Sequence, residues 1–473
     1  SSTTGEPISS TSTTEAPLLA PQTSPSNTEM TIVNLKSTYK VGEKIHVHIR
    51  SKDELKRDTN IGGDLYAIRL VVPDKNISMA SNIKDHGDGT YSSFIPLFWE
   101  GKVYIEGRLV MPSAAVNYAK RVQSSDVFVK KWVKRALFTH NDTTVKVQCD
   151  LDSVDKLTDI CDLTIYNGME PWFCQKHPDF PCSSFSSMDN PKPIPDDLDE
   201  NRYRFNDSYW KIEVKLKNLE ILVSPDPNFK QKDVDPLCKP GIPAVYPTGY
   251  FENQKWKSLV CKIKSFSAKE RKECLKNKYI LLFGDSNTRD LSYVMDEELK
   301  DENQTLLGEK HFFQNVGTTV EYIPLGHGLL RWPQPGNKMR SMEEVLSVPR
   351  EEVSAIIISI WAHFAFQPKP ALRERLLRLR SLLLNWKSAF PKVNIFLRSP
   401  HFRESYNLDY FFYTHNWGSL MSVNLFNRIF LDTPFHIIHM WEIVIASGYN
   451  FDIHPPESIK MESYQMILSR LCQ

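Results

Sequence analysis

The chain has 473 residues, of which 41% are hydrophobic, and a formal net charge of +1. This length allows two or three domains with sizeable cores. Balanced charge without a long basic run argues against a nucleic-acid-binding protein. The chain also lacks a stretch of about eighteen apolar residues, so we expect no membrane-spanning helix in it.

Residues 1–28 are rich in Ser, Thr, Pro and Glu and have almost no bulky apolar side chains. Such a segment cannot bury enough surface to offset its ordering entropy, so we expect a disordered stalk of the O-glycosylated kind. The chain begins at Ser1 rather than Met, which suggests that a signal peptide or membrane anchor has been removed upstream.

Cysteines and glycosylation sequons predict an oxidising compartment. The cysteine count is eight, an even number, and no CxxC pair occurs, which favours disulfides over a zinc site and leaves their pairing open. Together with the sequons, this pattern predicts the secretory pathway, either the Golgi lumen or the outside of the cell. The cysteines are Cys149, Cys161, Cys174, Cys182, Cys238, Cys261, Cys274 and Cys472, and the sequons begin at Asn76, Asn141, Asn206 and Asn303.

Residues 29–132 are predicted to form an all-β domain of short strands separated by turns. The turn Asp85-His86-Gly87-Asp88-Gly89 opens into Thr90-Tyr91, and this pattern with Trp99-Glu100-Gly101 resembles an immunoglobulin-like domain of the filamin type. That resemblance implies a β-sandwich and no activity. The β-prone runs are Thr31–Val33, Lys44–Ile49, Ala67–Val72, Tyr91–Ile95 and Lys102–Leu109.

Two histidines in this region, His46 and His48, alternate on one strand face. They could bind a metal ion, but no third ligand is evident nearby, and we expect them to be solvated. We predict no metal site.

Residues 133–240 are less regular and carry several of the cysteines. Trp172-Phe173-Cys174 together with Cys182 resembles the cysteine-rich part of neurexophilin-like proteins. We interpret this region as a disulfide-tied extension that connects the sandwich to the C-terminal domain.

Residues 241–473 show buried strands alternating with helical patterns, which predicts an open parallel sheet with functional loops at the carboxyl ends of its strands. One helix carries a leucine stripe from Leu372 to Leu383, and its other face holds Arg373, Arg375, Arg378 and Arg380. A solvated face explains these arginines better than an anion site. The expected strands are Tyr279–Phe283, Thr319–Ile323, Ala355–Ile360, Val393–Leu397 and Phe435–Met440.

A candidate nucleophile follows the first of these strands. Gly284-Asp285-Ser286 indicates a tight turn into a helix, which places the Ser286 hydroxyl among N–H groups that have no partner within the helix. Such groups can stabilise an oxyanion while the serine attacks a carbonyl. The alternative is that Ser286 only caps the helix.

A serine nucleophile needs a base and an acid that orients the base. Of thirteen histidines, His454 is best placed, because Pro455 and Pro456 fix it in a rigid loop before a final helix. Asp452 is close enough in sequence to hold the imidazole tautomer. The alternative is a surface loop in which both side chains face solvent.

At this point the chain resembles a known family. Gly284-Asp285-Ser286 with Thr288-Arg289, and Asp452 with His454, look like the PC-esterase branch of the SGNH hydrolase fold. Gly249-Tyr250-Phe251, Trp256, Cys261 and Cys274-Leu275 resemble the approach to its catalytic strand. With the regions in front, residues 30–473 resemble the neurexophilin and PC-esterase (NXPE) family. The resemblance implies a flavodoxin-like α/β/α catalytic domain behind the sandwich, and O-acyl ester chemistry on glycans.

Residue roles follow from the same resemblance. Ser286 would be the nucleophile, His454 the general base and Asp452 the orienting acid. His327-Gly328 resembles a His-Gly segment of the family, and Trp361-Ala362-His363-Phe364 resembles its Gly-x-His-Phe segment. His363 and the Ser286 amide are the expected oxyanion donors, with Gly284 and Asp285 in the same loop.

Two departures from the family pattern matter. The acid and histidine are spaced Asp-x-His instead of Asp-x-x-His, which makes Glu442 an alternative acid. Trp361 replaces a glycine, so a bulky side chain is expected to narrow the site.

Three functions remain open from the sequence. The first is an O-acetyltransferase that moves acetyl from acetyl-CoA through Ser286 to sialic acid on sialylated glycoproteins, with Arg289 either meeting the acceptor carboxylate or pairing with an acid. The second is a glycan O-acetylesterase that uses the same residues with water. The third is a secreted binding protein whose catalytic remnant is inert.

Overall fold

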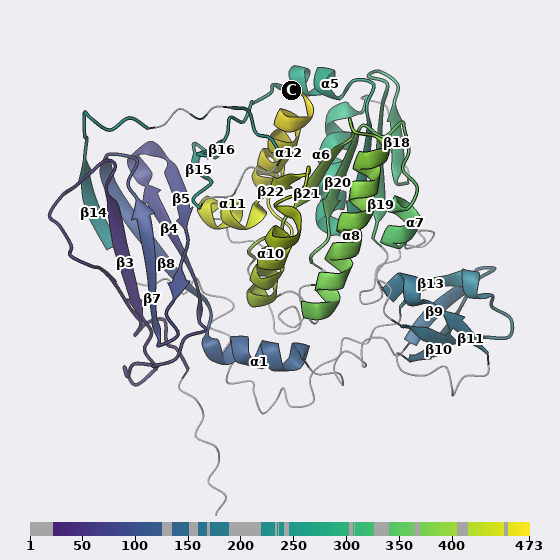
Figure 1. The fold of residues 1–473 in the computed structure, drawn as a ribbon, viewed down its shortest axis with the longest axis horizontal. Helices are drawn as coiled ribbons and strands as arrows, with labels where there is room; N and C mark the ends of the chain where they lie inside the picture. The colour runs from purple at the N-terminus through teal and green to yellow at the C-terminus, as the bar shows by residue number, and fades with distance from the viewer. Residues whose placement is uncertain are drawn as a thin grey trace, which may run out of the picture.

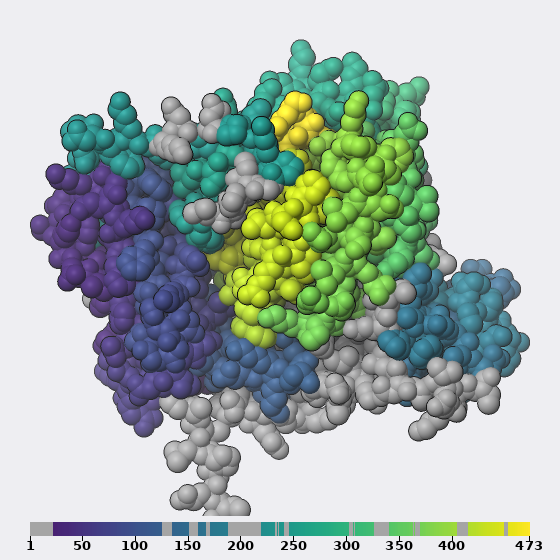
Figure 2. Space-filling view, in the orientation of Figure 1, coloured from purple at the N-terminus to yellow at the C-terminus, as the bar shows by residue number. Residues whose placement is uncertain are grey.

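The computed structural model describes residues 22–124, 135–150, 159–167, 171–188, 219–231, 234, 236–240, 246–301, 306, 308–325, 340–362, 364, 369–403, 415–448 and 453–473. Figure 1 shows three β-containing parts, with a two-sheet β region and a smaller cysteine-rich sheet on opposite flanks of a C-terminal α/β domain. The space-filling view in Figure 2 shows the same arrangement. No helix within these described ranges has the length and apolar character needed to cross a membrane.

The N-terminal β region consists of two sheets packed around one apolar core. The four-stranded sheet has the order β1-β3-β7-β6, and the seven-stranded sheet has the order β16-β15-β5-β4-β8-β14-β2. Alternate residues of β3 point into the core, where Ile45, Val47 and Ile49 are at most 1% exposed. The strands from this part of the chain are β1 (Glu29–Ile32), β2 (Tyr39–Lys40), β3 (Lys44–Arg50), β4 (Leu65–Val72), β5 (Ile77–Ser81), β6 (Lys84–Asp85), β7 (Thr90–Pro96) and β8 (Gly101–Met111).

Three further strands of the seven-stranded sheet come from later in the chain. β14 (Leu219–Ser224) pairs with β8, and the hairpin of β15 (Gly249–Glu252) and β16 (Lys255–Ser258) pairs with β5. The β region therefore continues into the segments that follow it, and the hairpin joins it to the C-terminal domain.

The cysteine-rich part forms a five-stranded sheet of order β11-β12-β10-β9-β13. Disulfides Cys149–Cys174 and Cys161–Cys182 cross this sheet, and Cys238–Cys261 and Cys274–Cys472 tie the C-terminal part, so all eight cysteines are paired. The helix α1 (Ser113–Gln123) packs in the same apolar cluster as Trp172. The strands are β9 (Arg135–His140), β10 (Thr143–Asp150), β11 (Ile160–Asp162), β12 (Phe173–Gln175) and β13 (Phe185–Met188).

The C-terminal domain is a six-stranded sheet covered by helices on both faces (Figure 1). Its order is β18-β19-β17-β20-β21-β22, and every neighbouring pair is parallel except that of the edge strand β18 with β19. The strands are β17 (Tyr279–Gly284), β18 (Lys310–Phe313), β19 (Thr318–Pro324), β20 (Ala355–Ser359), β21 (Asn394–Arg398) and β22 (His436–Ile438).

Alternation along β17 divides the core of this domain into two layers. Ile280 and Leu282 face α5 (Ala268–Leu275), α6 (Ser286–Leu299), α11 (Met440–Ser447) and α12 (Glu457–Leu471). Leu281 and Phe283 face α7 (Met342–Leu346), α8 (Lys369–Ala389) and α10 (Asn416–Phe430). These three layers place the carboxyl ends of the parallel strands at one edge, as the sequence pattern predicts.

Several surface expectations can be compared with this fold. Arg375 is only 3% exposed and lies over the Phe364 ring, so the prediction of a fully solvated arginine face on α8 is wrong at this position. His46 stacks on Phe94, and no cluster of potential metal ligands occurs within the described part of the chain. The sequons at Asn76 and Asn141 are exposed, whereas Asn206 and Asn303 lie outside the described residues.

Candidate active site

The turn between β17 and α6 positions Ser286 at the carboxyl edge of the sheet. Gly284, at a φ of +153°, ends the strand, and a Cβ there would collide with the Ser359 carbonyl oxygen and the Thr288 hydroxyl. Only glycine suits this backbone in so narrow a space. Asp285, rather than Ser286, caps the helix, because its Oδ1 accepts the Asn287 amide hydrogen at 3.0 Å. Ser286 is therefore the first residue of α6, and its hydroxyl is not used as the cap.

Asp285 also anchors the neighbouring loop. Its Oδ2 accepts hydrogen bonds from the backbone amides of Trp361 and Ala362, at 3.2 and 3.1 Å. Asp285 is 2% exposed, so its carboxylate bonds to backbone amides of the protein and not to solvent. The geometry gives Asp285 a positioning role in the loop where the sequence analysis places it.

His454 approaches Ser286 from the segment that precedes α12. Its Nε2 lies 3.3 Å from Ser286 Oγ, across 168 residues of sequence. This separation is at the long end of hydrogen-bond range, as is common for a serine–histidine pair without substrate. The imidazole can therefore take a proton from the hydroxyl.

The other imidazole nitrogen of His454 bonds Asp290, which lies one turn after Ser286 on α6. His454 Nδ1 is 2.9 Å from Asp290 Oδ2, and Lys460 Nζ on α12 is also 2.9 Å from that oxygen. Burial alone would raise the pKa of Asp290, but the hydrogen bonds from His454 and Lys460 outweigh it and hold that pKa well below its usual range. Asp290 is therefore ionised at neutral pH and fixes His454 with Nε2 directed at the serine.

The sequence analysis missed Asp290. Asp452, the acid expected from the Asp-x-His pattern, lies outside the described residues. The prediction of Glu442 as the alternative acid is wrong. Glu442 lies on α11, where its carboxylate accepts hydrogen bonds from the Thr248 amide and hydroxyl at 2.6 and 2.5 Å. The available signal was the spacing of Ser286 and Asp290, since residues four apart share one face of a helix.

Of the remaining residues predicted for the site, the structure describes Arg289 and not the others. Arg289 is 37% exposed in its side chain, with Nη2 3.5 Å from Asp290 Oδ1 and the guanidinium over the Tyr293 ring. It therefore lies beside the site and pairs in part with the acid. His327, Gly328 and His363 lie outside the described residues.

The Trp361 side chain turns into the protein, where it is 2% exposed and meets the His401 ring edge-on at 4.6 Å.

A buried arginine forms a hydrogen bond to the first turn of α6. Arg398, at the end of β21, donates from Nη1 to the Asn287 carbonyl at 2.9 Å. Burial lowers the pKa of Arg398 to about 10, and the nearby carboxylates of Asp285 and Asp290 act in the opposite direction. Its charge compensates two buried acids of the site.

Comparison with solved structures gives weak similarity only. The filamin domain of Lin-41 has a TM-score of 0.16 and 8% identity over 18% of this chain and 80% of its own. A family two carbohydrate esterase from Clostridium thermocellum, in complex with cellohexaose, has a TM-score of 0.23 and 8% identity over 91% of this chain and 92% of its own. These TM-scores are too low to support an assignment of either fold.

Comparison with protein families is more informative. The family model described as neurexophilin matches residues 6–190. The model described as NXPE family member 4-like, C-terminal domain, matches residues 256–472, which include Ser286, Asp290 and His454. The two matches follow one another along the chain in the order that the sequence predicts. The chain belongs to the neurexophilin and PC-esterase (NXPE) family.

Proposed function

We propose that this protein is a glycan O-acetyltransferase in which Ser286, His454 and Asp290 form the catalytic triad. The observation that carries the proposal is the continuous chain from Ser286 Oγ through both imidazole nitrogens to Asp290. A hydroxyl, an imidazole and an ionised acid in this order activate serine for acyl transfer on unrelated folds. Membership of a PC-esterase-like family supports the same chemistry.

Acylation begins when His454 Nε2 removes the proton from Ser286 Oγ as the oxygen attacks the acetyl carbonyl of acetyl-CoA. The new Oγ–C bond gives a tetrahedral oxyanion. The Ser286 amide, the first N–H of α6, has no partner within the helix and is the proposed donor to this oxyanion. Collapse of the intermediate breaks the C–S bond, and the leaving thiolate takes the proton from His454.

Transfer repeats these steps with a sugar hydroxyl. His454 removes the proton of the acceptor hydroxyl, whose oxygen attacks the acetyl-serine carbonyl and releases Ser286, which regains the proton. During both steps the His454 imidazolium is stabilised by Asp290, 2.9 Å away.

Sialic acid on secretory glycoproteins is the proposed acceptor. Arg289 is half-exposed beside the nucleophile and is held only at 3.5 Å by Asp290, so its guanidinium is available to a carboxylate of the acceptor. The disulfides and the neurexophilin match indicate a secretory protein. We place the reaction in the Golgi lumen or outside the cell.

The experiment uses acetyl-CoA labelled in the acetyl group, with a sialylated glycoprotein and its desialylated form as acceptors. We expect label on the sialylated glycan only. Ser286→Ala should abolish incorporation, and the matched change Ser292→Ala should not, because Ser292 lies on the same helix and donates only to the Arg289 carbonyl.

Two outcomes of this experiment would contradict the transferase proposal and favour another function. Release of acetate from pre-acetylated sialoglycan, without incorporation, would indicate an esterase that uses the same triad. Absence of both activities in the folded protein would support the non-catalytic binding role.

A further inference from the structure

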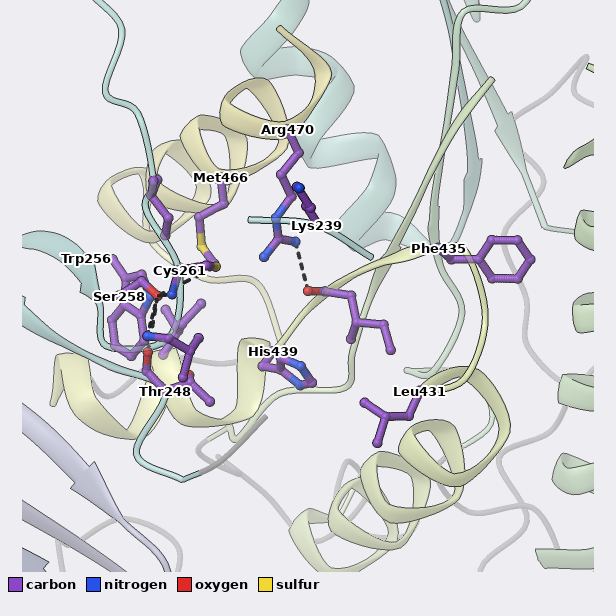
Figure 3. A pocket seen from close by; sticks show the side chains of 14 residues that line it. Lys239, Thr248, Trp256, Ser258, Cys261, Leu431, Phe435, His439, Met466 and Arg470 are labelled. Atoms are coloured by element: carbon purple, nitrogen blue, oxygen red, sulfur yellow. Dashed lines mark hydrogen bonds between the residues drawn. The ribbon is translucent and has the colours of Figure 1, made fainter. Parts of the chain in front are cut away.

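A small cavity lies between the β15–β16 hairpin and the C-terminal helices (Figure 3), and Ser286 is not one of its lining residues. Its volume is about 50 Å³, and its walls come from β16, β22, α11, α12 and the segment around Cys261. Arg470 lies thirteen residues after the start of α12, at Glu457, so at about 1.5 Å per residue the cavity is roughly 20 Å along the helix from the His454 end. The cavity and the proposed triad are therefore separate sites.

Among the described residues that line it, the cavity has a positive charge and no acidic partner for that charge. Figure 3 shows the Arg470 guanidinium directed into the space. Lys239 also lines the cavity, and none of its fourteen described lining residues is acidic. Arg470 Nη1 donates to the Ile437 carbonyl at 2.9 Å, and among the described residues Nε has no partner. A cation that is removed from water without an acid is costly, and an anion in the cavity would compensate it.

Three other arginines of the domain differ in this respect. Arg271 pairs with Glu298 at 2.6 Å, and Arg350 pairs with Glu321 at 2.9 Å. Arg398 is 3% exposed, but two acids lie close enough to counteract its burial. For Arg470, burial lowers the pKa to about 10, and no acid in the described part of the chain counteracts it.

The lining also limits what the anion can be. A water occupies about 10–15 Å³ on this measure, so the cavity accepts only a group of a few heavy atoms. Leu431, Phe435, Ile443 and Met466 give it apolar walls that suit a short alkyl group. Burial, followed by the charge of Arg470, lowers the pKa of His439 to about 4, so this imidazole is neutral and offers a hydrogen bond without charge.

We propose that this cavity is a binding site for a small carboxylate of acetate size, held by the Arg470 guanidinium. A planar guanidinium matches a carboxylate through two parallel hydrogen bonds, and one buried cation balances one negative charge. Lys239 is exposed at the entrance and adds long-range attraction.

The test titrates the full chain with ¹³C-labelled acetate, followed by NMR, with sodium chloride added to hold ionic strength constant. We expect saturable binding that Arg470→Met weakens at least about tenfold, through loss of the charged fork. Lys239→Glu, an exposed change that should not disturb folding, should weaken binding several-fold. Ser286→Ala should bind acetate like the wild type, which separates this site from the proposed acyl site.

Inorganic phosphate is the second probe. Phosphate that binds as tightly as acetate would overturn the carboxylate assignment. Absence of saturable acetate binding, or equal affinity in wild type and Arg470→Met, would overturn the site. If Arg470→Met does not fold by circular dichroism, Arg470→Lys and Lys239→Glu provide the same comparison.

Discussion

Ser286 and Asp290 stand four residues apart on α6, and His454 contacts both of them, with Nε2 3.3 Å from the serine and Nδ1 2.9 Å from the aspartate. Residues at this spacing share one face of a helix, about 5–6 Å apart at their Cβ atoms. An imidazole spans that gap. The proposed nucleophile and acid are therefore fixed by one rigid helix, and only the base comes from another segment.

Replacing the acid should remove most of the activity. Asp290→Asn leaves the packing almost unchanged but no longer stabilises the imidazolium or its tautomer, and we expect kcat for acetyl transfer to fall by about 10³-fold. Single-turnover and steady-state assays with labelled acetyl-CoA measure this change.

The control is Asp296→Asn on the same helix. Asp296 Oδ2 pairs with His311 Nδ1 at 3.0 Å, so this variant also breaks an aspartate–histidine contact, but without touching Ser286. Activity of Asp296→Asn should stay near wild type. Equal loss in the two variants would mean that damage to α6, and not loss of the triad acid, explains the result.

Lys460 is expected to tune the triad as a positioning residue. It shares Asp290 Oδ2 with His454, so Lys460→Met removes a positive charge beside the pair and favours the protonated imidazole. The acid limb of the kcat/KM–pH profile should move up by about one unit, while Lys460→Arg should keep the wild-type profile. An unchanged profile in Lys460→Met would show that the lysine has only a structural contact.

Glu442 should make stability depend on pH. Burial raises the pKa of Glu442 to about 7 despite the hydrogen bonds from Thr248, so the fold favours the protonated carboxyl. The contribution of Glu442 to the free energy of unfolding is fully present below pH 4.5, the ordinary pKa of a glutamate. This contribution is lost as pH rises through 7, and its upper limit is about 3 kcal/mol.

Glu442→Gln keeps an amide that can donate to the Thr248 hydroxyl and removes the titration. We expect its melting temperature to exceed that of the wild type at pH 8 and to match it at pH 4. Glu273→Gln, at a side chain that is 74% exposed, is the control and should show no such difference. If the melting temperatures of the wild type and Glu442→Gln change identically with pH, Glu442 is not buried as a neutral carboxyl.

Gly284 should tolerate no side chain. Gly284→Ala adds a Cβ against the Ser359 carbonyl at a positive φ, and we expect a loss of stability of several kcal/mol together with loss of activity. Gly87→Ala separates the two causes, since Gly87 has a φ of +83° but open space around it. If both variants lose stability equally, backbone conformation and not the close approach to β20 explains the glycine.

The local patterns predicted the C-terminal domain well, because buried strands and amphipathic helices are properties of short segments. The apolar run before Gly284 and the prolines after His454 were enough to find two of the three residues that meet in the site. The acid was missed because attention to the Asp-x-His pattern placed it beside His454 in sequence. A helix neighbour of Ser286 fulfils the same geometry from another element.

Long-range pairing accounts for what the sequence did not predict. The alternation in β14 marks it as a strand, but its partner β8 lies more than a hundred residues earlier, and no local signal connects them. The joining of the β15–β16 hairpin to β5 and the pairing of Cys274 with Cys472 depend on the same kind of distant contact. Arg375 follows the polar face of α8 in sequence, but its guanidinium lies over the Phe364 ring.

The most direct test of the central claim is intact-protein and peptide mass spectrometry after rapid mixing with acetyl-CoA and quenching in acid. We predict one acetyl group on the peptide that contains Ser286, absent from Ser286→Ala, reduced in Asp290→Asn and discharged when sialylated glycan is added. Acetyl-CoA consumed at the wild-type rate by Ser286→Ala, with no acetyl on that peptide in either protein, would contradict the account.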